Sequence, residues 1–235
     1  MIVNNYFDWA IQDPGPVNAV NGYNNRGLGM IPHSAEGHWD TLQALHDFHW
    51  SRATNPDPRK RASWAATNLK DGRFVQHYPV TAQTWTSGSG YPNNNFFAFE
   101  NEGVAGEPLT QAQVDNILRA GRELMDHFGW KPKRPVDDTD KTASLYEHRE
   151  CVRFGSASTA CPSDRIPWDV IVPALTEEDD MAERVWCFDR AQTWIVGKGG
   201  AAPVAYPIDD KVWESIYGPH TKAMSGADLD KIAVK

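Results

Sequence analysis

Between Leu109 and Phe128, apolar residues recur at the spacing of one helix face. Thr110 and Gln113 match the T-x-x-Q capping box that commonly starts a helix, and Gly129 stands where glycine commonly ends one. The apolar face consists of Val114, Ile117, Leu118, Leu124, Met125 and Phe128. The pattern predicts a packing helix over residues 109–128, and we assign it no chemistry.

Helical spacing also appears in two shorter segments. The segment EGHWDTLQALHDFHW (36–50) predicts a helix that begins just past His33, and PWDVIVPAL (167–175) predicts the last helix of the main domain. The apolar positions of the first segment are Trp39, Leu42, Leu45 and Phe48.

Alternation with a period of two predicts the strands. Apolar and polar residues alternate on either side of Asp71-Gly72, which is a strong short-range signal for a hairpin. The segment GLGMIPHS (27–34) follows an Asn-, Gly- and Pro-rich opening and predicts a short strand.

A further strand is predicted in NNNFFAFENEG (93–103). Because side chains of a strand alternate between its two faces, Glu100 and Glu102 should share one face and Phe97 and Phe99 the other. The spacing therefore predicts one apolar face and one acidic face.

Two domains of unequal size are expected. An acidic break, TEEDDMAE (176–183), follows the last predicted helix. We expect a main domain over residues 1–178 and a small α+β C-terminal module over 179–235, with two or three short strands and one or two short helices. The module is too small for a sizeable core of its own. It therefore either packs on the main domain or is a minimal module that binds the cell wall.

Composition narrows the classes of partner. The 235 residues carry a formal net charge of -8, whereas proteins that bind nucleic acid through phosphate contacts usually present a basic face. No run approaches the ~18 apolar residues of a membrane helix, and the N-terminal residues lack a basic and apolar secretion signal. We expect a protein made in the cytoplasm that binds no nucleic acid and inserts into no membrane.

Three residues could bind a metal ion. Taken singly, His33 and His148 have structural or surface roles as alternatives, and Cys161 could be a buried apolar residue, a disulfide partner of Cys151 or a nucleophile. Taken together, two imidazoles and a thiolate suit zinc, and catalytic zinc sites use three protein ligands and leave a fourth position open. The paired spacing C-x-x-C of closed structural zinc sites is absent from the sequence.

The order of several motifs resembles a known family. His33 after a strand is followed by ASW, KDGRFVQHYPVTAQTWTSGS, NNNFFAFENEG, EHRE and TACPS. This order, over residues 27–175, is similar to that of the type-2 zinc N-acetylmuramoyl-L-alanine amidases, a superfamily that includes the peptidoglycan recognition proteins and many phage endolysins. The version here is most similar to lysins of phages that infect actinobacteria. The resemblance implies an α/β fold with a central mixed β-sheet flanked by helices.

The resemblance also implies roles for individual residues. It implies that His33, His148 and Cys161 bind one catalytic zinc ion, and that Glu100 of FENEG shuttles protons. Another branch of the family uses a tyrosine from the preceding strand, and this chain has none there. Thr159 stands where several members place a lysine that supports the oxyanion. A threonine hydroxyl can donate one hydrogen bond there but brings no charge.

Further residues are candidates for contact with substrate. Trp85 is kept in TWTSG, where the family has W-H-A-G, and Thr86 replaces the histidine. Glu102 is either a supporting hydrogen-bond partner of the site, a charge near zinc or a solvated edge residue, and we favour support. The other candidates for lining a groove, with packing or turn roles as the alternative, are Trp64, Tyr91, Asn93 and Asn94.

The resemblance implies hydrolysis of the amide between N-acetylmuramic acid and L-alanine in peptidoglycan, by a phage or prophage endolysin that reaches the wall after release from the host cytoplasm. A monomer is favoured. A muropeptide-binding module without activity is the main alternative, and a cytoplasmic recycling amidase is another. A glycosidase is disfavoured because two carboxylates two positions apart on one strand would approach a sugar from one side. A cysteine hydrolase is disfavoured because Cys161 has no base partner besides the histidines.

Overall fold

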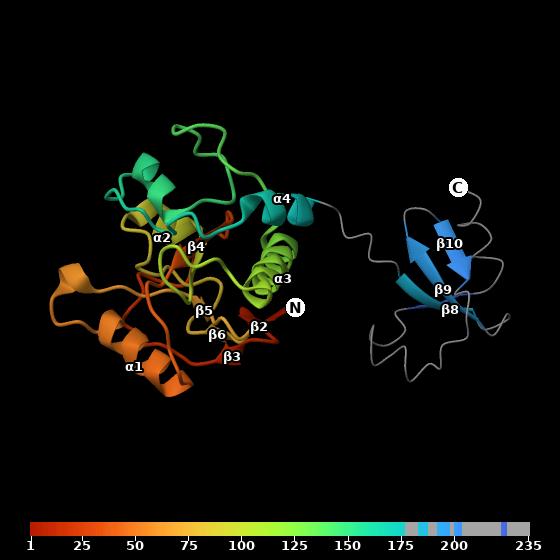
Figure 1. The fold of residues 1–235 in the computed structure, drawn as a ribbon, viewed down its shortest axis with the longest axis horizontal. Coiled ribbons are helices and arrows are strands. Elements are labelled where there is room, and N and C mark those ends of the chain that lie inside the picture. Colours follow the sequence, from red (N-terminus) through yellow and green to blue (C-terminus); the bar gives the residue numbers. More distant parts are fainter. Residues whose placement is uncertain (177–182, 188–191, 198–199, 204–221, 225–235) are drawn as a thin grey trace. The chain divides into compact units, whose positions relative to one another are not determined.

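A computed structural model describes residues 1–176, 183–187, 192–197, 200–203 and 222–224 (Figure 1). The chain divides into two compact units, Met1–Thr176 and Glu177–Lys235. The sequence places the predicted break in the same part of the chain, and the role of the second unit stays a prediction. Among the described residues, no helix combines the length and apolar character needed to cross a membrane.

The first unit is built on a five-stranded sheet with the order β3-β6-β5-β7-β4. Strands β5 and β6 are antiparallel, and the other neighbouring pairs are parallel, so the sheet is mixed. Its strands are β3 (Ile11–Gln12), β4 (Met30–Ser34), β5 (Ala66–Asn68), β6 (Phe74–Gln76) and β7 (Phe97–Asn101). A separate two-stranded sheet pairs β1 (Ile2–Val3) with β2 (Tyr6–Phe7). The α/β class with a mixed central sheet is confirmed.

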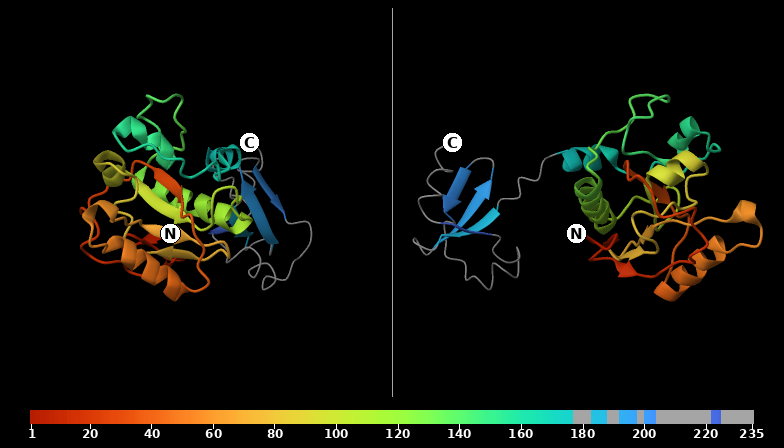
Figure 2. Two further views of the ribbon diagram at one scale, coloured as in Figure 1. Left: turned by 60° about the vertical axis from the view of Figure 1, so that its left-hand side comes forward. Right: turned by 180° about the vertical axis from the view of Figure 1, so that it is seen from behind.

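Helices flank this sheet, as Figure 2 shows from two further directions. The α-helices are α1 (Leu42–Ala53), α2 (Gly90–Asn95), α3 (Gln111–Phe128) and α4 (Trp168–Thr176). Short 3-10 helices are η1 (Pro58–Lys60) and η2 (His148–Phe154). The alternation along β6 separates the layers: Phe74 packs in the cluster that contains α3 and α4, whereas Val75 packs with Leu45 of α1. Helices α1 and α3 therefore cover opposite faces of the sheet.

The main core lies between the sheet and helix α3. Phe97 and Phe99 of β7 are buried there against Val114, Ile117 and Leu124 of the helix. The predicted caps of α3 are confirmed, because Thr110 and Gln113 form the capping box and Gly129 adopts a left-handed φ of 76°. The helix itself begins at Gln111, two residues after the predicted start at Leu109, because Thr110 caps it from outside. The stripe of apolar residues thus anchors the helix, as the periodicity indicates.

The predicted start of the first helix is wrong. Helix α1 begins at Leu42 with Thr41 as its cap, eight residues beyond Ser34, the end of β4. Residues before it are held by the rest of the fold: Gly37 pairs with Gly103 in an isolated bridge, and the amide of Trp39 donates to the Glu102 carboxylate at 3.0 Å. These long-range contacts keep Trp39 out of the helix.

Two strand predictions have different outcomes. The hairpin around Asp71-Gly72 is confirmed, because β5 and β6 pair on either side of it. The strand predicted from residue 93 begins later, at Phe97, since Asn93–Asn95 form the end of α2. Pro92 in the first turn suits a helix there, because its ring fixes φ and its missing N–H needs no partner.

The second unit contains a four-stranded sheet with the order β10-β9-β8-β11. The sequence predicts two or three strands here, so at least one strand of this sheet is missed. The strands are β8 (Glu183–Cys187), β9 (Gln192–Gly197), β10 (Gly200–Pro203) and β11 (Lys222–Met224). The short helices expected there lie outside the described residues.

Candidate functional site

Two of the predicted site residues lie side by side on the sheet. In the parallel pair β4 and β7, His33 stands opposite Glu100, and Thr67 of β5 stands on the other side of Glu100. Nδ1 of His33 is 4.0 Å from a carboxylate oxygen of Glu100. Because Phe97 and Phe99 face the main core, the alternation of the strand turns Glu100 to the face that carries α1.

Two segments outside the sheet bring the other predicted ligands to this edge of the sheet. His148 opens η2, and Cys161 lies in the segment between η2 and α4. The ligand atoms of His33, His148 and Cys161 all lie within 4.8 Å of one another. Sγ of Cys161 is 3.6 Å from Nδ1 of His33, and it accepts the Ser34 amide at 3.3 Å. The structure thus brings together the three residues that the sequence predicts as ligands.

The predicted disulfide alternative does not occur, because Cys151 and Cys161 are both free. Cys151 is fully buried and contacts the Glu147 carbonyl through its sulfur, at 3.5 Å. Burial raises the pKa of Cys161 to about 12, with the charge of Glu100 acting in the same direction. A thiol with this pKa is a poor nucleophile, which argues against a cysteine hydrolase.

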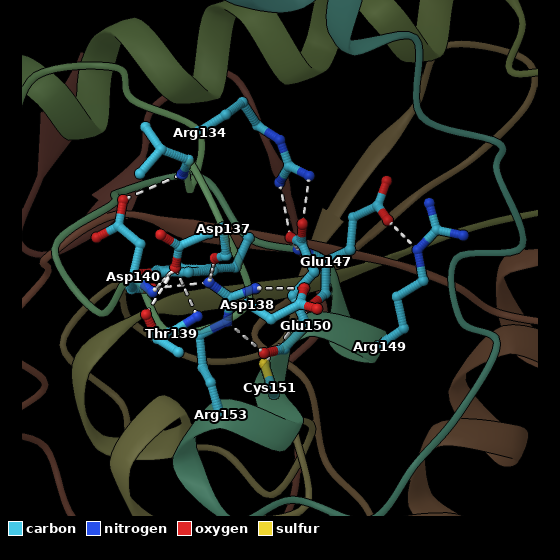
Figure 3. A network of polar contacts seen from close by, with 12 residues as sticks. Arg134, Asp137, Asp138, Thr139, Asp140, Glu147, Arg149, Glu150, Cys151 and Arg153 are labelled. Atoms are coloured by element: carbon cyan, nitrogen blue, oxygen red, sulfur yellow. Dashed lines mark hydrogen bonds and ion pairs between the residues drawn. The ribbon is translucent and has the colours of Figure 1, made fainter.

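These two segments are joined by polar contacts around one buried residue, Glu147. Glu147 is 1% exposed and accepts hydrogen bonds from Nε of Arg149 and from Nε1 of Trp168, the latter at 2.7 Å. The Arg149 amide donates to the Cys161 carbonyl at 2.8 Å. Figure 3 shows Glu147 and Arg149 beside the Arg134–Glu150 ion pair of the same region, in which two hydrogen bonds of 2.9 and 2.7 Å form. These contacts fix His148 relative to Cys161.

A further hydrogen bond orients His33. Its Nε2 lies 3.2 Å from the Ser87 hydroxyl, so Nδ1, which is near Cys161, is left to act as a ligand atom. Ser87 is fully buried, and its amide donates to Oδ1 of Asn93 at 2.7 Å. Burial lowers the pKa of His33 well below its ordinary value, helped by the charge of His148, and burial also lowers the pKa of His148. Both imidazoles are therefore neutral at neutral pH, which is the form that binds a metal.

Glu100 lines a pocket of about 270 Å³ on the α1 side of the sheet. One of its carboxylate oxygens is buried without a hydrogen-bond partner in the described part of the chain. Burial raises the pKa of Glu100 to about 8, although the charge of Arg52 acts against the increase. The other lining residues are Ala35, Phe48, Arg52, Ala62, Trp64 and Thr86.

Thr159 lies beside the ligand loop. Its hydroxyl oxygen accepts the Cys161 amide at 3.2 Å. The hydroxyl proton is therefore free to donate, as the predicted oxyanion role requires. That role stays a prediction.

Of the two tryptophans predicted to bind substrate, Trp64 lines the Glu100 pocket and Trp85 does not. Trp64 is 3% exposed and donates from Nε1 to the Thr67 hydroxyl at 2.8 Å, and one side of it lines the Glu100 pocket. Trp85 is half-buried and donates from Nε1 to Asn21 at 2.7 Å. Thr86, which replaces the family's histidine, donates to the Ser63 carbonyl and also lines the pocket.

The polar candidates have supporting contacts. Glu102 is buried, and its two carboxylate oxygens accept the amides of Trp39 at 3.0 Å and Lys70 at 2.8 Å. These contacts agree with the favoured role of Glu102 as a supporting hydrogen-bond partner, and they occupy both of its oxygens, so Glu102 does not serve as a second catalytic carboxylate beside Glu100. Asn93 supports Ser87, and Oδ1 of Asn94 is buried without a partner among the described residues. Their contact with substrate stays a prediction.

Three residues of the site are not among those predicted from the sequence. Ser87 lies in TWTSG, but only the fold brings it to His33. Glu147 directly precedes the predicted ligand His148, and this position could have indicated a role for it. Its hydrogen bond to Trp168, however, joins residues 21 positions apart. Arg52 lies in α1 and reaches the Glu100 pocket, and no local pattern indicates this.

The fold and this cluster define an α/β protein with a candidate metal centre beside a partly buried acid. Residues 24–164 match the model of the Amidase_2 family, described as N-acetylmuramoyl-L-alanine amidase. The match spans more than half of the 235 residues, and the chain belongs to this family. No curated protein matches the chain.

Solved structures share the fold at low sequence identity. The N-acetylmuramoyl-L-alanine amidase LysC from Clostridium intestinale URNW is 20% identical with a TM-score of 0.51, over 71% of this chain and 96% of that one. A selenomethionine derivative of AmpD is 16% identical with a TM-score of 0.56, over 74% and 98%. The hydrolase AmiA from Staphylococcus aureus is 16% identical with a TM-score of 0.54, over 72% and 82%. At these identities the likeness shows the fold.

Proposed function

We propose that this protein is a zinc-dependent amidase that hydrolyses the bond between N-acetylmuramic acid and the L-alanine of the peptidoglycan stem peptide. The observation that carries the proposal is the convergence of His33, His148 and Cys161 beside Glu100. Membership in the amidase family supports the reaction class.

The donor set fits zinc. Two neutral imidazoles and one sulfur, with ligand atoms within 4.8 Å of one another, match the preference of zinc for nitrogen and sulfur donors. When bound, zinc supplies a Lewis acid for the scissile carbonyl and lowers the pKa of a water molecule to about 7. Ser87 holds the His33 ring in the orientation that this binding needs.

Glu100 carries the proton transfer. Burial raises its pKa to about 8, so at neutral pH the carboxyl group can hold a proton on the oxygen that has no other partner. It can hand this proton to the amine that departs from the cleaved amide. General acid-base groups of this kind contribute on the order of 10²- to 10⁴-fold to a rate.

Thr159 supports the reacting carbonyl oxygen. Its hydroxyl accepts the Cys161 amide and keeps its proton for donation. A neutral hydroxyl stabilises a developing negative charge less than a lysine does, so a larger share of that task remains for the other groups of the site.

The biological role we propose is that of a phage or prophage endolysin that is made in the host cytoplasm and acts as a monomer on the wall after release. The net charge of -8 favours recognition of the wall through shape and hydrogen bonds over charge attraction. The second unit is our candidate for wall binding. A recognition module without activity is the second candidate, and the complete ligand set disfavours it.

One experiment tests the proposal. Purified peptidoglycan is incubated with the wild type, with the wild type plus a strong chelator, and with Glu100→Gln, and the products are read by mass spectrometry. We expect new L-alanine amino ends with the wild type and a loss on the order of 10²-fold or more in the other two reactions. New reducing sugar ends would contradict the proposal, and binding without products would support the recognition module.

Metal content provides the matched test of the ligands. We expect Cys161→Ser to lose most of the bound zinc and Cys151→Ser to keep it, because only Cys161 lies among the ligand atoms. Full zinc occupancy in Cys161→Ser would overturn this assignment.

A further inference from the structure

Arg52 stands in the last turn of helix α1 and lines the same pocket as Glu100. The side chain is exposed, and within the described residues it forms no ion pair and no hydrogen bond through its guanidinium group. Arg165, another arginine of the site region, is buried and bonds to Ser34 and to three backbone carbonyls. Arg52 is therefore a cation with free donors at the wall of the pocket.

The position of Glu100 indicates which part of the substrate enters this pocket. In the proposed reaction, Glu100 gives a proton to the departing amine, so the space beside Glu100 adjoins the leaving group. The leaving group is the stem peptide, which begins with L-alanine. Most of the remaining wall is apolar and suits a small methyl side chain, and it consists of Ala35, Phe48, Ala62 and Trp64.

The residue after L-alanine in a stem peptide is a D-glutamate whose α-carboxyl group is either free or amidated. We propose that Arg52 binds this carboxylate and makes the protein prefer acidic over amidated stem peptides. The proposal rests on the amidase function above. A guanidinium group presents parallel N–H donors that match the two oxygens of a carboxylate, whereas a carboxamide offers one acceptor and an opposing N–H donor.

A structural role for Arg52 makes different predictions. A cation in the last turn of a helix stabilises the helix end, and its loss would lower stability and affect every substrate equally. A role limited to the charge balance of Glu100 would also act equally on both forms of the substrate. Only a direct contact separates the acidic from the amidated peptide.

The test uses two probes that differ in this group alone, N-acetylmuramoyl-L-alanyl-D-glutamate and N-acetylmuramoyl-L-alanyl-D-isoglutamine. Binding is measured by calorimetry with the full chain carrying Glu100→Gln, so that cleavage does not interfere. We expect the acidic probe to bind about tenfold more tightly, as a charge-assisted contact provides. Adding Arg52→Gln should abolish this preference, and Arg52→Lys should keep part of it.

Arg59→Gln is the matched control. It removes the same charge from an exposed arginine whose partner is Asp57, and we expect the tenfold preference to remain. Melting temperatures of all variants show whether Arg52→Gln folds as the parent does. Equal binding of the two probes by the parent, failure of both to bind, or an equal loss for both in Arg52→Gln would overturn the proposal.

Cleavage of the same probes by protein with Glu100 intact separates this inference from the function on which it rests. Cleavage without a preference would support the amidase and overturn the Arg52 contact. A preference in binding without cleavage would support the Arg52 contact and count against the amidase.

Discussion

The sheet and the loops hold their parts of the site in different ways. His33 and Glu100 stand on neighbouring strands, where the hydrogen bonds of the parallel ladder set their positions. His148 and Cys161 stand outside the sheet, where side-chain contacts around Glu147 and one backbone hydrogen bond join their loops. The sheet half of the site, His33 and Glu100, therefore depends on the core beneath it, whereas the loop half, His148 and Cys161, depends on a few polar groups.

The largest effect is expected from the core below the sheet half. Phe99 is fully buried on the face of β7 opposite Glu100. Phe99→Ala should lower the free energy of unfolding by about 3–5 kcal/mol, because it leaves a cavity in a packed core. Urea unfolding measures this change. The control is Val152→Ala in η2, where a side chain 46% exposed should change stability by about 0.5 kcal/mol or less. Similar losses in both variants would contradict the comparison.

The next effect tests the loop half. Glu147→Gln weakens the buried contacts with Arg149 and Trp168, and we expect zinc affinity to fall about 10- to 100-fold, as for other groups that orient ligands. Competition with a zinc chelator measures it.

Asp164→Asn provides the matched control for Glu147→Gln. It removes the exposed partner of the same arginine, and Asp164 is 80% exposed, so zinc affinity should stay nearly unchanged. If the two variants behave alike, the loops are not held by Glu147.

A smaller effect is expected when the sheet half loses its polar support. Ser87→Ala removes the partner of Nε2 of His33, and zinc affinity should fall about tenfold, the lower end of the same range, because β4 still positions the residue. The same chelator competition measures it, with Ser89→Ala as the control. A loss larger than that of Glu147→Gln would reverse the comparison between the two halves.

The last prediction concerns how the free energy of unfolding depends on pH, through a buried histidine on the α1 side of the sheet. His49 is fully buried, and its two ring nitrogens have no hydrogen-bond partner among the described residues. Burial, helped by the charge of His77, lowers its pKa to about 2, so the unfolded chain takes up a proton near pH 6.5 that the folded chain does not. Stability from this group is present above pH 6.5 and is lost as the pH falls from there toward 2.

Between pH 7.5 and 5.5 this uptake should cost the wild type about 1.4 kcal/mol, which His49→Gln does not lose. Urea unfolding of both proteins at a series of pH values measures the difference, and effects of other groups cancel in it. Parallel stability curves for the two proteins would show that His49 does not titrate as its burial predicts.

Local patterns account for much of the fold. The capping box at Thr110, the glycine at 129 and the Asp71-Gly72 turn each act within a few residues, and the structure confirms all three. The predicted start of α1 is wrong because the residue that holds Trp39 outside the helix is distant in sequence: Glu102 accepts the Trp39 amide. An apolar period cannot show that a distant carboxylate holds a residue outside a helix.

The candidate site divides in the same way. The sequence by itself determined which residue types were available, because two histidines, a cysteine and an acid in this order are chemical facts of the chain. Only the tertiary structure decided that they meet, that Glu102 faces backbone amides while Glu100 faces a pocket, and that Arg52 lines this pocket. The physical reason is range: propensity and capping act within one or two turns, whereas strand register and loop contacts join residues more than a hundred positions apart, such as His33 and Cys161.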